Sequence, residues 1–214
     1  MPRASRQLPL PLPGRGGKRP GAGRKPKGDS PGVSHKARPH FDKPSVAHVT
    51  LRVANHVWSL RSRRCFGPIE ECLEQARGRL GLRVVHFSVL GNHLHLVVEA
   101  DGSRALSRGM QGVAIRLAKA VNGVMEARGR VFADHYHARL LGTPTEVVNA
   151  IAYVLDNHAH HYPGAAGRDR FSSAGSQAAV AAPTTWLLRA GWRRARRVPL
   201  RVREELERQR GREA

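Results

Sequence analysis

The segment Val84-Val85-His86-Phe87-Ser88-Val89-Leu90-Gly91-Asn92-His93-Leu94-His95-Leu96-Val97-Val98-Glu99 decides the fold. It consists of two β-rich runs joined by Gly91-Asn92, a dipeptide that suits a tight turn, and it therefore predicts a β-hairpin. Side chains alternate between the two faces of a strand. Leu94, Leu96 and Val98 therefore share one face, which we expect to be buried.

Two histidines occupy the other face of the same predicted strand. His93 and His95 lie roughly 7 Å apart at about 3.3 Å per residue, and from this spacing two imidazoles can reach one divalent ion. The alternative is that both are ordinary residues of a polar face, because a His-x-His motif is short and often occurs by chance. A second motif is needed to decide between the two interpretations.

Charge is the strongest compositional signal. The chain of 214 residues carries 37 Lys and Arg against 16 Asp and Glu, a net charge of +21. Residues 1–44 hold 11 basic and 2 acidic side chains, residues 45–167 hold 14 and 9, and residues 168–214 hold 12 and 5. The two tails thus carry most of the excess, which favours a polyanionic partner such as nucleic acid. A genome-wide drift toward arginine explains part of the excess but not its clustering.

Several classes of protein are disfavoured by the composition. We see no run of about 18 apolar residues, which a membrane span needs, and the N-terminus lacks the apolar region of a signal peptide. The two cysteines, Cys65 and Cys72, do not have the spacing of a metal site. We therefore expect a soluble protein in a reducing, cytosolic compartment, with no membrane partner.

Residues 1–44 are rich in Pro, Gly, Arg and Lys, and we expect this arm to be disordered on its own. Within it, Lys18-Arg19-Pro20-Gly21-Ala22-Gly23-Arg24-Lys25-Pro26 resembles an AT-hook, an extended segment that places arginine in the minor groove of A·T-rich DNA. Arg19, Arg24 and Lys25 would be its DNA contacts. A generic basic linker is the alternative interpretation, because Lys25 interrupts the Gly-Arg-Pro core.

The rest of the chain predicts an α+β domain. A strand with alternating apolar residues runs from residue 47 to 53, a helix from 69 to 80, the hairpin follows, a long helix spans 106–124, and a strand spans 130–141. Thr143-Pro144-Thr145-Glu146 then starts another helix, with a cap, a proline at the first position and a capping-box glutamate. The order βαββαβ plus a helix predicts a ferredoxin-like antiparallel sheet with helices on one face.

The last helix of this order carries the second motif. Its apolar residues from Val147 to Leu155 fall within an arc of about 120°, and Tyr153 lies roughly opposite. Asn157 is four residues further and adjacent on the surface. This is either a solvated face with an incidental tyrosine or a face that packs over His93 and His95. In the second case, two imidazoles and an amide oxygen suit Mg²⁺ or Mn²⁺ better than Zn²⁺.

Taken together, Asn92-His93-Leu94-His95, the segment 129–140 and Tyr153-Val154-Leu155-Asp156-Asn157 resemble the single-tyrosine HUH transposases, in particular the REP-associated tyrosine transposase branch of that insertion-sequence family. The resemblance covers residues 45–165. This chain departs from the family at Asn157-His158, where Asn-Pro is usual, and at His135-Tyr136-His137, where Arg-Tyr-His is usual. Val154-Leu155 replaces Ile-His. The catalytic set is intact, but substrate contacts differ.

The resemblance implies an HUH endonuclease fold with an added catalytic helix and a single-strand DNA nicking and joining activity. Tyr153 would be the nucleophile and would form a 5′-phosphotyrosine link, with Mg²⁺ or Mn²⁺ on His93, His95 and Asn157. The partner would be single-stranded or hairpin DNA in a bacterial cytoplasm, associated with the nucleoid. The acting unit would be a monomer or a homodimer. Tyr136 is the rival nucleophile, although its place between two histidines of a strand favours a phosphate contact.

Residues 166–214 form a basic extension in which Trp186 and Trp192 are interleaved with arginines, so this segment either stacks on bases or docks on the domain.

The alternative to an enzyme is a domesticated, non-catalytic protein that binds hairpin repeats. An RNA-binding ferredoxin-like module is disfavoured, because the hairpin strands lack RNP-like aromatic pairs. We expect DNA contacts from Arg19, Arg24, Lys25, Arg116, Lys119, Tyr136, Arg139, Arg193 and Arg194.

Overall fold

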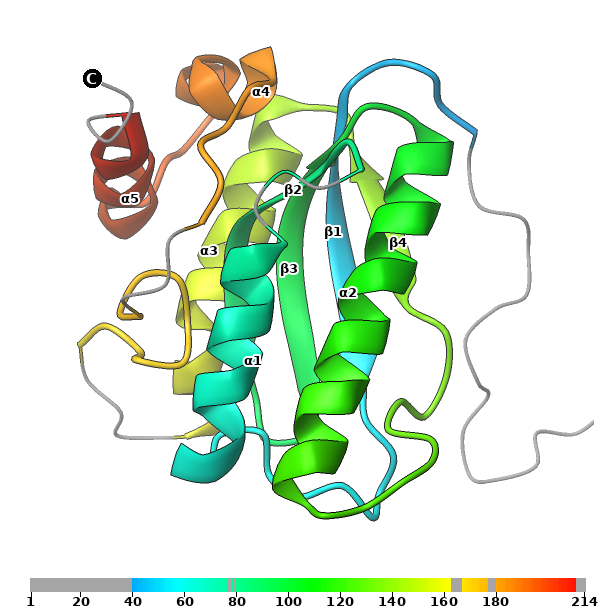
Figure 1. Ribbon diagram of the computed structural model, residues 1–214. Coiled ribbons are helices and arrows are strands. Elements are labelled where there is room, and N and C mark those ends of the chain that lie inside the picture. The colour runs from blue at the N-terminus through cyan, green and yellow to red at the C-terminus, as the bar shows by residue number, and fades with distance from the viewer. Residues whose placement is uncertain (1–39, 77, 79, 163–166, 177–179, 211–214) are drawn as a thin grey trace, which may run out of the picture. The chain divides into compact units, whose positions relative to one another are not determined.

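The predicted hairpin is formed by β2 (Leu82–Val89) and β3 (His93–Ala100), which pair antiparallel in this computed structural model (Figure 1). Gly91-Asn92 makes the turn, and Leu90 N donates to His93 O across it at 2.9 Å. The structure describes residues 40–76, 78, 80–162, 167–176 and 180–210. All of them belong to one compact unit, residues 33–214. The AT-hook-like stretch lies outside the described residues.

The sheet has the predicted ferredoxin-like topology. Strand β1 (Ser45–Arg52) pairs antiparallel with β3 on one side and with β4 (His137–Leu141) on the other, which gives the order β2-β3-β1-β4. Helix α1 (Arg63–Gln75) connects β1 to β2, and α2 (Ser103–Val124) connects β3 to β4. The α+β, βαββαβ prediction is therefore confirmed.

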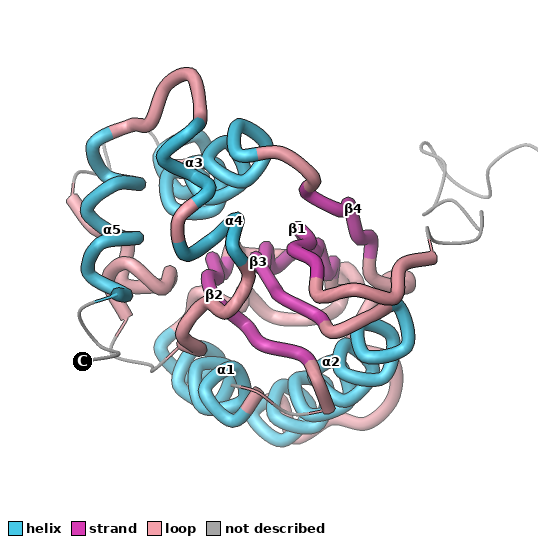
Figure 2. The backbone as a smooth tube through the Cα atoms, turned by 90° about the horizontal axis from the view of Figure 1, so that it is seen from above, coloured by secondary structure: helices cyan, strands magenta, loops and turns pink. Residues whose placement is uncertain are grey.

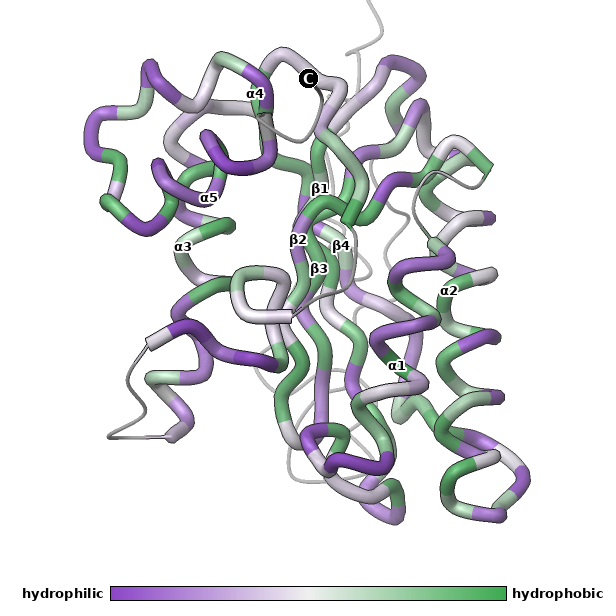
Figure 3. The backbone as a smooth tube through the Cα atoms, turned by 60° about the vertical axis from the view of Figure 1, so that its left-hand side comes forward, coloured by the Kyte–Doolittle hydropathy of each residue, from purple (hydrophilic) through white to green (hydrophobic). Residues whose placement is uncertain are grey.

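Helices α1 and α2 cover one face of the sheet (Figure 2). Leu94, Leu96 and Val98 are buried in the core that forms there, as the alternation along β3 predicts. Helix α2 approaches the sheet closely at Gly109, where a Cβ atom would lie 2.4 Å from Cβ of Leu82. Figure 3 shows how hydropathy follows this packing. The central strands are mostly hydrophobic, and the helices alternate between hydrophilic and hydrophobic residues.

Helix α3 (Pro144–His161) covers the other face, together with α4 (Trp186–Arg189), the 3₁₀ helix η1 (Gly191–Arg194) and α5 (Leu200–Arg210) (Figure 2). Their buried side chains form a second core with apolar residues of the strands. Residues from the predicted extension 166–214 thus share a core with the predicted domain 45–165. In the described part of the chain, no helix combines the length and the apolar character that a bilayer-spanning segment needs.

Two predicted elements, the strand at 130–141 and the helix at 69–80, have wrong boundaries. Of the strand expected over 130–141, only residues 137–141 are a strand; before it, Phe132 makes an isolated bridge with Val53. The side chain of Asp134 accepts the N–H of His135 at 2.7 Å, which removes that donor from any strand partner. Helix α1 spans residues 63–75 and not the predicted 69–80, so both of its ends are shifted; the Ser62 hydroxyl caps its start by accepting from Cys65 N at 3.2 Å.

A buried carboxylate fastens the C-terminal elements to the sheet. Glu99 of β3 is fully buried and accepts hydrogen bonds from the N–H and hydroxyl groups of Thr184 and Thr185, at 2.6–2.8 Å. Arg83 forms an ion pair with it at 3.1 Å. Burial alone raises the pKa of Glu99, but the hydrogen bonds from Thr185 and Thr184 together lower it. The carboxylate therefore stays charged where α4 begins.

We predict that Glu99→Gln lowers the free energy of unfolding by about 2–4 kcal/mol, because an amide nitrogen cannot accept from the threonines. Asp101→Asn is the matched control, since Asp101 pairs with the same arginine at 2.7 Å but is half exposed, and we expect less than about 1 kcal/mol from it. Urea titration measures both values. Equal effects of the two substitutions would contradict the anchoring role.

The Glu99→Gln variant also tests how the free energy of unfolding depends on pH. Because the folded state lowers the pKa of Glu99, its stabilisation is present above the unfolded-state value of 4.5 and is lost as the pH falls through the folded-state pKa. The difference between wild type and Glu99→Gln should therefore be constant from pH 8 to 5.5 and shrink below about pH 4. A difference that grows on acidification would show the opposite linkage.

Candidate functional site

The two histidines of β3 face α3, on the side of the sheet opposite the first core. Their rings are perpendicular, with centroids 4.8 Å apart. His95 is 5% exposed, and His93 is partly exposed at the hairpin end of the strand. This is the placement expected from the alternation along β3, and it leaves both imidazoles directed at the helix that carries the tyrosine motif.

Tyr153 of α3 lies against His95 of the same chain. The ring centroids are 5.0 Å apart and the planes meet at 82°. Tyr153 also contacts His48, at 5.7 Å between centroids, and is 44% exposed. The phenol ring and the imidazoles thus meet edge to face, while part of the Tyr153 side chain remains open to solvent. The helix face that the sequence left undecided between solvent and the histidines packs over the histidines.

Asn157 lies on the same stripe of α3. His161, two turns after Tyr153, contacts His93 with ring centroids 5.7 Å apart. Residues spaced by four share one side of a helix, so Asn157 lies between the two ring contacts and is buried. Its Nδ2 atom has no hydrogen-bond partner within the described residues. The structure thus brings together all four predicted residues: His93, His95, Tyr153 and Asn157.

Two residues of β1 that the sequence did not single out complete the surroundings of His95. Its Nδ1 atom lies 3.1 Å from Thr50 Oγ1 and 3.2 Å from His48 Nε2. Thr50 Oγ1 and His48 Nε2 can each accept a hydrogen bond from His95 Nδ1–H, and in that tautomer Nε2 keeps its lone pair for a ligand. The contacts depend on the β1–β3 register, which pairs Thr50 with His95. The only signal in the sequence was that His48 and Thr50 share the polar side of an alternating strand.

The nitrogen atoms that remain fit a metal ion. His95 Nε2 is buried and has no hydrogen-bond partner among the described residues. His93 Nδ1–H donates to Asn92 Oδ1 at 2.7 Å, which leaves its Nε2 available. Such outer hydrogen bonds orient metal-binding imidazoles. Within the described ranges no group of three or more His, Cys, Asp or Glu side chains could hold a metal, so a site here would consist of the two imidazoles and the Asn157 amide.

The imidazoles are held in the neutral form that ligation needs. Burial lowers the pKa of His95 to about 3, and the neighbouring His93, His48 and His161 add to the effect. Burial also lowers the pKa of His93, helped by His161 and Arg52. Protons therefore do not compete for these nitrogens at neutral pH.

Positive charge surrounds this neutral centre. The strand registers place Arg52 beside His93 and Arg139 beside His48. A pocket of about 270 Å³ opens next to the tyrosine and is lined by His48, Arg139, Leu141, Glu146, Asn149, Ala150 and Tyr153. This side of the sheet can therefore attract a phosphate group to the phenol.

Glu146 at the edge of that pocket is engaged in the cap of α3. Its carboxylate accepts from Gly142 N at 3.0 Å, Thr143 N at 3.2 Å and Arg139 at 2.8 Å. The hydrogen bond from Gly142, then those from Arg139 and Thr143, lower its pKa. Glu146 is therefore a charged capping group and a poor general base.

The other end of α3 is held by Arg61. Its guanidinium forms a bidentate pair with Asp169 at 2.7 and 2.8 Å and donates to Val89 O at 3.0 Å. It also lies over the rings of Phe171, at 4.1 Å, and Tyr162, at 4.8 Å. Tyr162 directly follows α3, so this cluster fixes the end of the helix beside the end of β2. The stripe of Tyr153 and Asn157 is thereby kept over β3.

The remaining predicted contacts fall on different surfaces. Arg116 and Lys119 lie on α2, and Tyr136 packs against the first core, so all three are on the face opposite the histidines. Arg193 and Arg194 lie on η1, on the α3 side. Tyr136, the rival nucleophile, is thus separated from His93 and His95 by the sheet.

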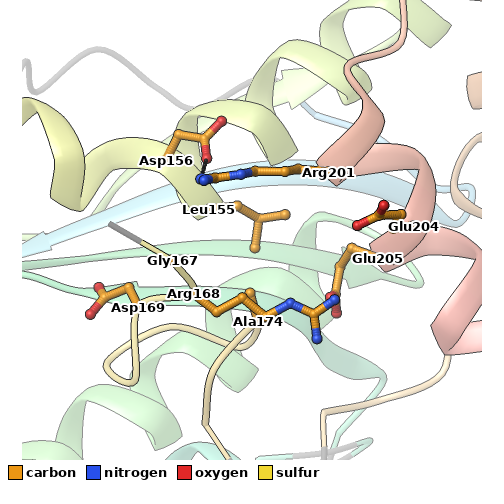
Figure 4. A pocket seen from close by; sticks show the side chains of 9 residues that line it. All are labelled: Leu155, Asp156, Gly167, Arg168, Asp169, Ala174, Arg201, Glu204 and Glu205. Atoms are coloured by element: carbon orange, nitrogen blue, oxygen red, sulfur yellow. Dashed lines mark hydrogen bonds and ion pairs between the residues drawn. The ribbon is translucent and has the colours of Figure 1, made fainter. Parts of the chain in front are cut away.

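A further pocket, of about 130 Å³, lies between α3, the loop around residue 169 and α5 (Figure 4). It is lined by Asp156 and Arg201, which form an ion pair at 2.9 Å, and by Glu204 and Glu205. None of the histidines and tyrosines of the site lines it. We interpret it as a seam between packed elements.

Comparison with known proteins supports the fold. Neither a protein-family model nor a curated protein matches the chain. Among solved structures, a REP-associated tyrosine transposase bound to a REP hairpin superposes with a TM-score of 0.51 and 11% sequence identity, over 61% of this chain and 75% of that one. A Deinococcus radiodurans R1 protein assigned as a transposase gives 0.39 and 12%, over 53% and 88%. The first likeness shows that this chain shares the fold of that tyrosine transposase.

We predict that His95 makes the stability of the metal-free protein fall on acidification. Its pKa is 6.5 in the unfolded chain and about 3 in the fold, so the unfolded state takes up the proton first and stability is lost from about pH 6.5 downward. At pH 5 this amounts to about 2 kcal/mol relative to pH 7.5.

Urea titrations in EDTA at both pH values measure this effect. His95→Gln should show a correspondingly smaller loss between pH 7.5 and 5. Another buried histidine, His86, whose pKa is also lowered to about 3, contributes to both proteins alike. An unchanged pH dependence in His95→Gln would contradict the buried, neutral state of this imidazole.

Proposed function

We propose that this protein is a transposase-type, metal-assisted single-strand DNA nicking and joining enzyme with one catalytic tyrosine, Tyr153. The observation that carries the proposal is the contact of the Tyr153 ring with His95, 5.0 Å between centroids, beside a buried imidazole nitrogen that has no partner in the described chain. A partly exposed phenol next to an unsatisfied metal-type donor set is the arrangement that phosphotyrosine chemistry requires.

In the proposed reaction, Tyr153 Oη attacks a backbone phosphorus atom. A phosphorus–oxygen bond to tyrosine forms and the bond to the 3′ oxygen breaks, so the phenol loses a proton and the departing 3′ oxygen gains one. The products are a 5′-phosphotyrosine and a free 3′-OH, and the reverse step joins strands without ATP. His93, His95 and Asn157 would hold Mg²⁺ or Mn²⁺, which when bound polarises the phosphate.

The residues around the phenol suit a single-stranded, phosphate-rich substrate. Arg139, which lines the pocket with Tyr153, would contact the phosphates on one side of the cut. A single strand can bend into such a pocket, whereas a duplex backbone is held straight. The structural neighbour with the better superposition is bound to a REP hairpin, which supports hairpin-flanked DNA as the substrate and DNA transposition or repeat mobilisation as the process.

The second candidate function is a domesticated, non-catalytic protein that recognises hairpin repeats with the same scaffold. It would use the same basic surfaces, including Arg193 and Arg194, but it gives Tyr153 no role. The ordered stripe of Tyr153, Asn157 and His161 over the histidine pair favours the enzyme. The DNA contacts of Arg19, Arg24 and Lys25, which lie outside the described residues, stay a prediction for either function.

The decisive test is a covalent adduct. The full-length protein is incubated with end-labelled, hairpin-containing single-stranded DNA and Mg²⁺ or Mn²⁺, and adducts are resolved on a denaturing gel. We expect an adduct that Tyr153→Phe reduces by more than about 10³-fold, because the nucleophilic oxygen is gone. His95→Ala and EDTA should also abolish it.

Tyr136→Phe is the matched control and should retain the adduct, because Tyr136 lies on the other side of the sheet. If Tyr153→Phe retains the adduct and Tyr136→Phe loses it, the assignment of the nucleophile is wrong. If no hairpin or single-stranded substrate gives an adduct while binding persists, the non-catalytic function is the correct one.

The site also predicts how the chains cooperate. Tyr153 contacts His95 of its own chain, so each monomer would hold a complete site. Mixing the Tyr153→Phe and His95→Ala proteins should therefore leave adduct formation below about 1% of wild type, as each lacks one essential group. Recovery in the mixture, in proportion to the fraction of mixed dimers, would instead show a site shared between two chains.

A further inference from the structure

The two tryptophans of the C-terminal elements have different environments. Trp192 of η1 is 2% exposed and packs in the second core with Leu188 and residues of α3. Trp186, the first residue of α4, is 52% exposed. Both sequence interpretations of this segment therefore apply, one to each tryptophan: Trp192 docks the segment on the domain, and Trp186 presents a large aromatic surface to solvent.

The exposed indole is held in a defined position. A Cβ atom at Gly191 would lie 2.6 Å from Cζ3 of Trp186, so the ring lies directly against the glycine backbone. The guanidinium of Arg194 lies 5.3 Å from the ring centroid. Packing an exposed ring on glycine stabilises the core little, since half of the ring stays in water. The arrangement instead fixes the orientation of a flat, accessible surface.

Arginines follow Trp186 in a stretch of sequence that has no acidic residue. Residues 189–197 include five arginines, and the sequence has no Asp or Glu from residue 170 to 203. Arg193, Arg194, Arg196 and Arg197 are exposed, and within the described ranges no carboxylate forms a salt bridge with any of the four. Their charge is therefore available to an external anion.

The surface lies on the side of the sheet that carries the candidate site. Leu188 and Trp192 share the second core with Val147 and Ile151 of α3, and Figure 2 shows α4 beside α3, away from α1 and α2. The helix that carries Tyr153 is thus also the support of the arginine-flanked tryptophan.

We propose that Trp186 and the arginines at 193, 194, 196 and 197 form a second nucleic-acid-binding surface, on which an unpaired base of the DNA stacks on the indole while the guanidinium groups contact the adjoining phosphates. An aromatic ring combined with a cationic groove binds single strands in this way, because every base has a flat face and every linkage a negative charge. The inference rests on the proposed function for the identity of the strand as DNA. It assigns Trp186 to binding, with no part in the chemistry.

The test measures binding of the full-length protein to fluorescein-labelled oligo(dT) by anisotropy in EDTA, so that no cleavage occurs. Trp186→Ala should weaken binding by about 10-fold, the typical effect of losing one base–aromatic stack, and leave the salt dependence unchanged. Removing Arg193 and Arg194 together should reduce the slope of log K against log salt by about 1.4, which is about 0.7 for each phosphate contact.

Trp58→Ala is the matched control, because Trp58 is similarly exposed, at 44%, but lies in the loop before α1. It should leave the affinity unchanged. Gly191→Ala should reproduce the effect of Trp186→Ala by displacing the ring, whereas Gly123→Ala, where a Cβ atom meets nothing within 4 Å, should not. Trp186→Phe keeps a ring and should retain most of the affinity while losing the quenching of tryptophan fluorescence by DNA, which separates stacking from misfolding.

Three outcomes would overturn the proposal: equal affinities of wild type and Trp186→Ala, equal losses for Trp58→Ala and Trp186→Ala, or a fluorescence response of Trp186 to anionic lipid vesicles and none to oligo(dT). The adduct assay and the binding assay test the proposed function and this surface independently. If Trp186 contributes to DNA binding but no Tyr153 adduct forms, the second surface stands and the enzyme does not. If the adduct forms and Trp186→Ala binds normally, the enzyme stands and this surface does not.

Discussion

The alternation of side chains along β3 is the constraint on which the rest of the structure depends. One face of this strand supplies Leu94, Leu96 and Val98 to the core under α1 and α2, and the other presents His93, His95 and Glu99 to α3 and the C-terminal elements. Because β3 is paired on both sides, a shift of one residue would bury the histidines in the first core and turn Leu94, Leu96 and Val98 toward α3. The first core therefore enforces the register that places the imidazoles under Tyr153. Packing under α1 and α2 thus determines the geometry of the site on the α3 side of the sheet.

Position along the helix is controlled separately, from its two ends. Thr143 and Glu146 form a capping box at the start of α3, and Arg61 with Asp169 holds the residue that follows its end. A capping box alone fixes only the first turn, whereas Asn157 and His161 lie in the last two. The ion pair and the aromatic rings around Arg61 fix the C-terminal end of α3, and the hydrogen bonds of the capping box fix its start. A nucleophile on a helix that is fixed at both ends needs little reorganisation before it reacts.

The sequence predicted what depends on local patterns. The hairpin, the order of elements and the Tyr153–Asn157 stripe all follow from periodicities of two or four residues and from capping motifs. The contacts of His48 and Thr50 with His95 span more than forty residues and depend on strand register, which no local pattern contains. The anchoring of Thr184 and Thr185 by Glu99 is more distant still, at more than eighty residues. The expected strand at 130–136 failed for a local reason, because Asp134 competes with the backbone for a hydrogen bond.

Charge and chemistry are separated in space, and this separation explains the unusual composition. At the centre, burial and mutual repulsion keep the imidazoles neutral, as the lowered pKa values of His93 and His95 show. Guanidinium groups, which stay charged at any physiological pH, are placed around it on Arg52 and Arg139 and further away on η1. Salt screens exposed charges much more than buried groups. Added salt should therefore release a polyanion from the surface without altering the buried donor set, so that the net charge of +21 serves the capture of the strand while the imidazoles themselves stay neutral.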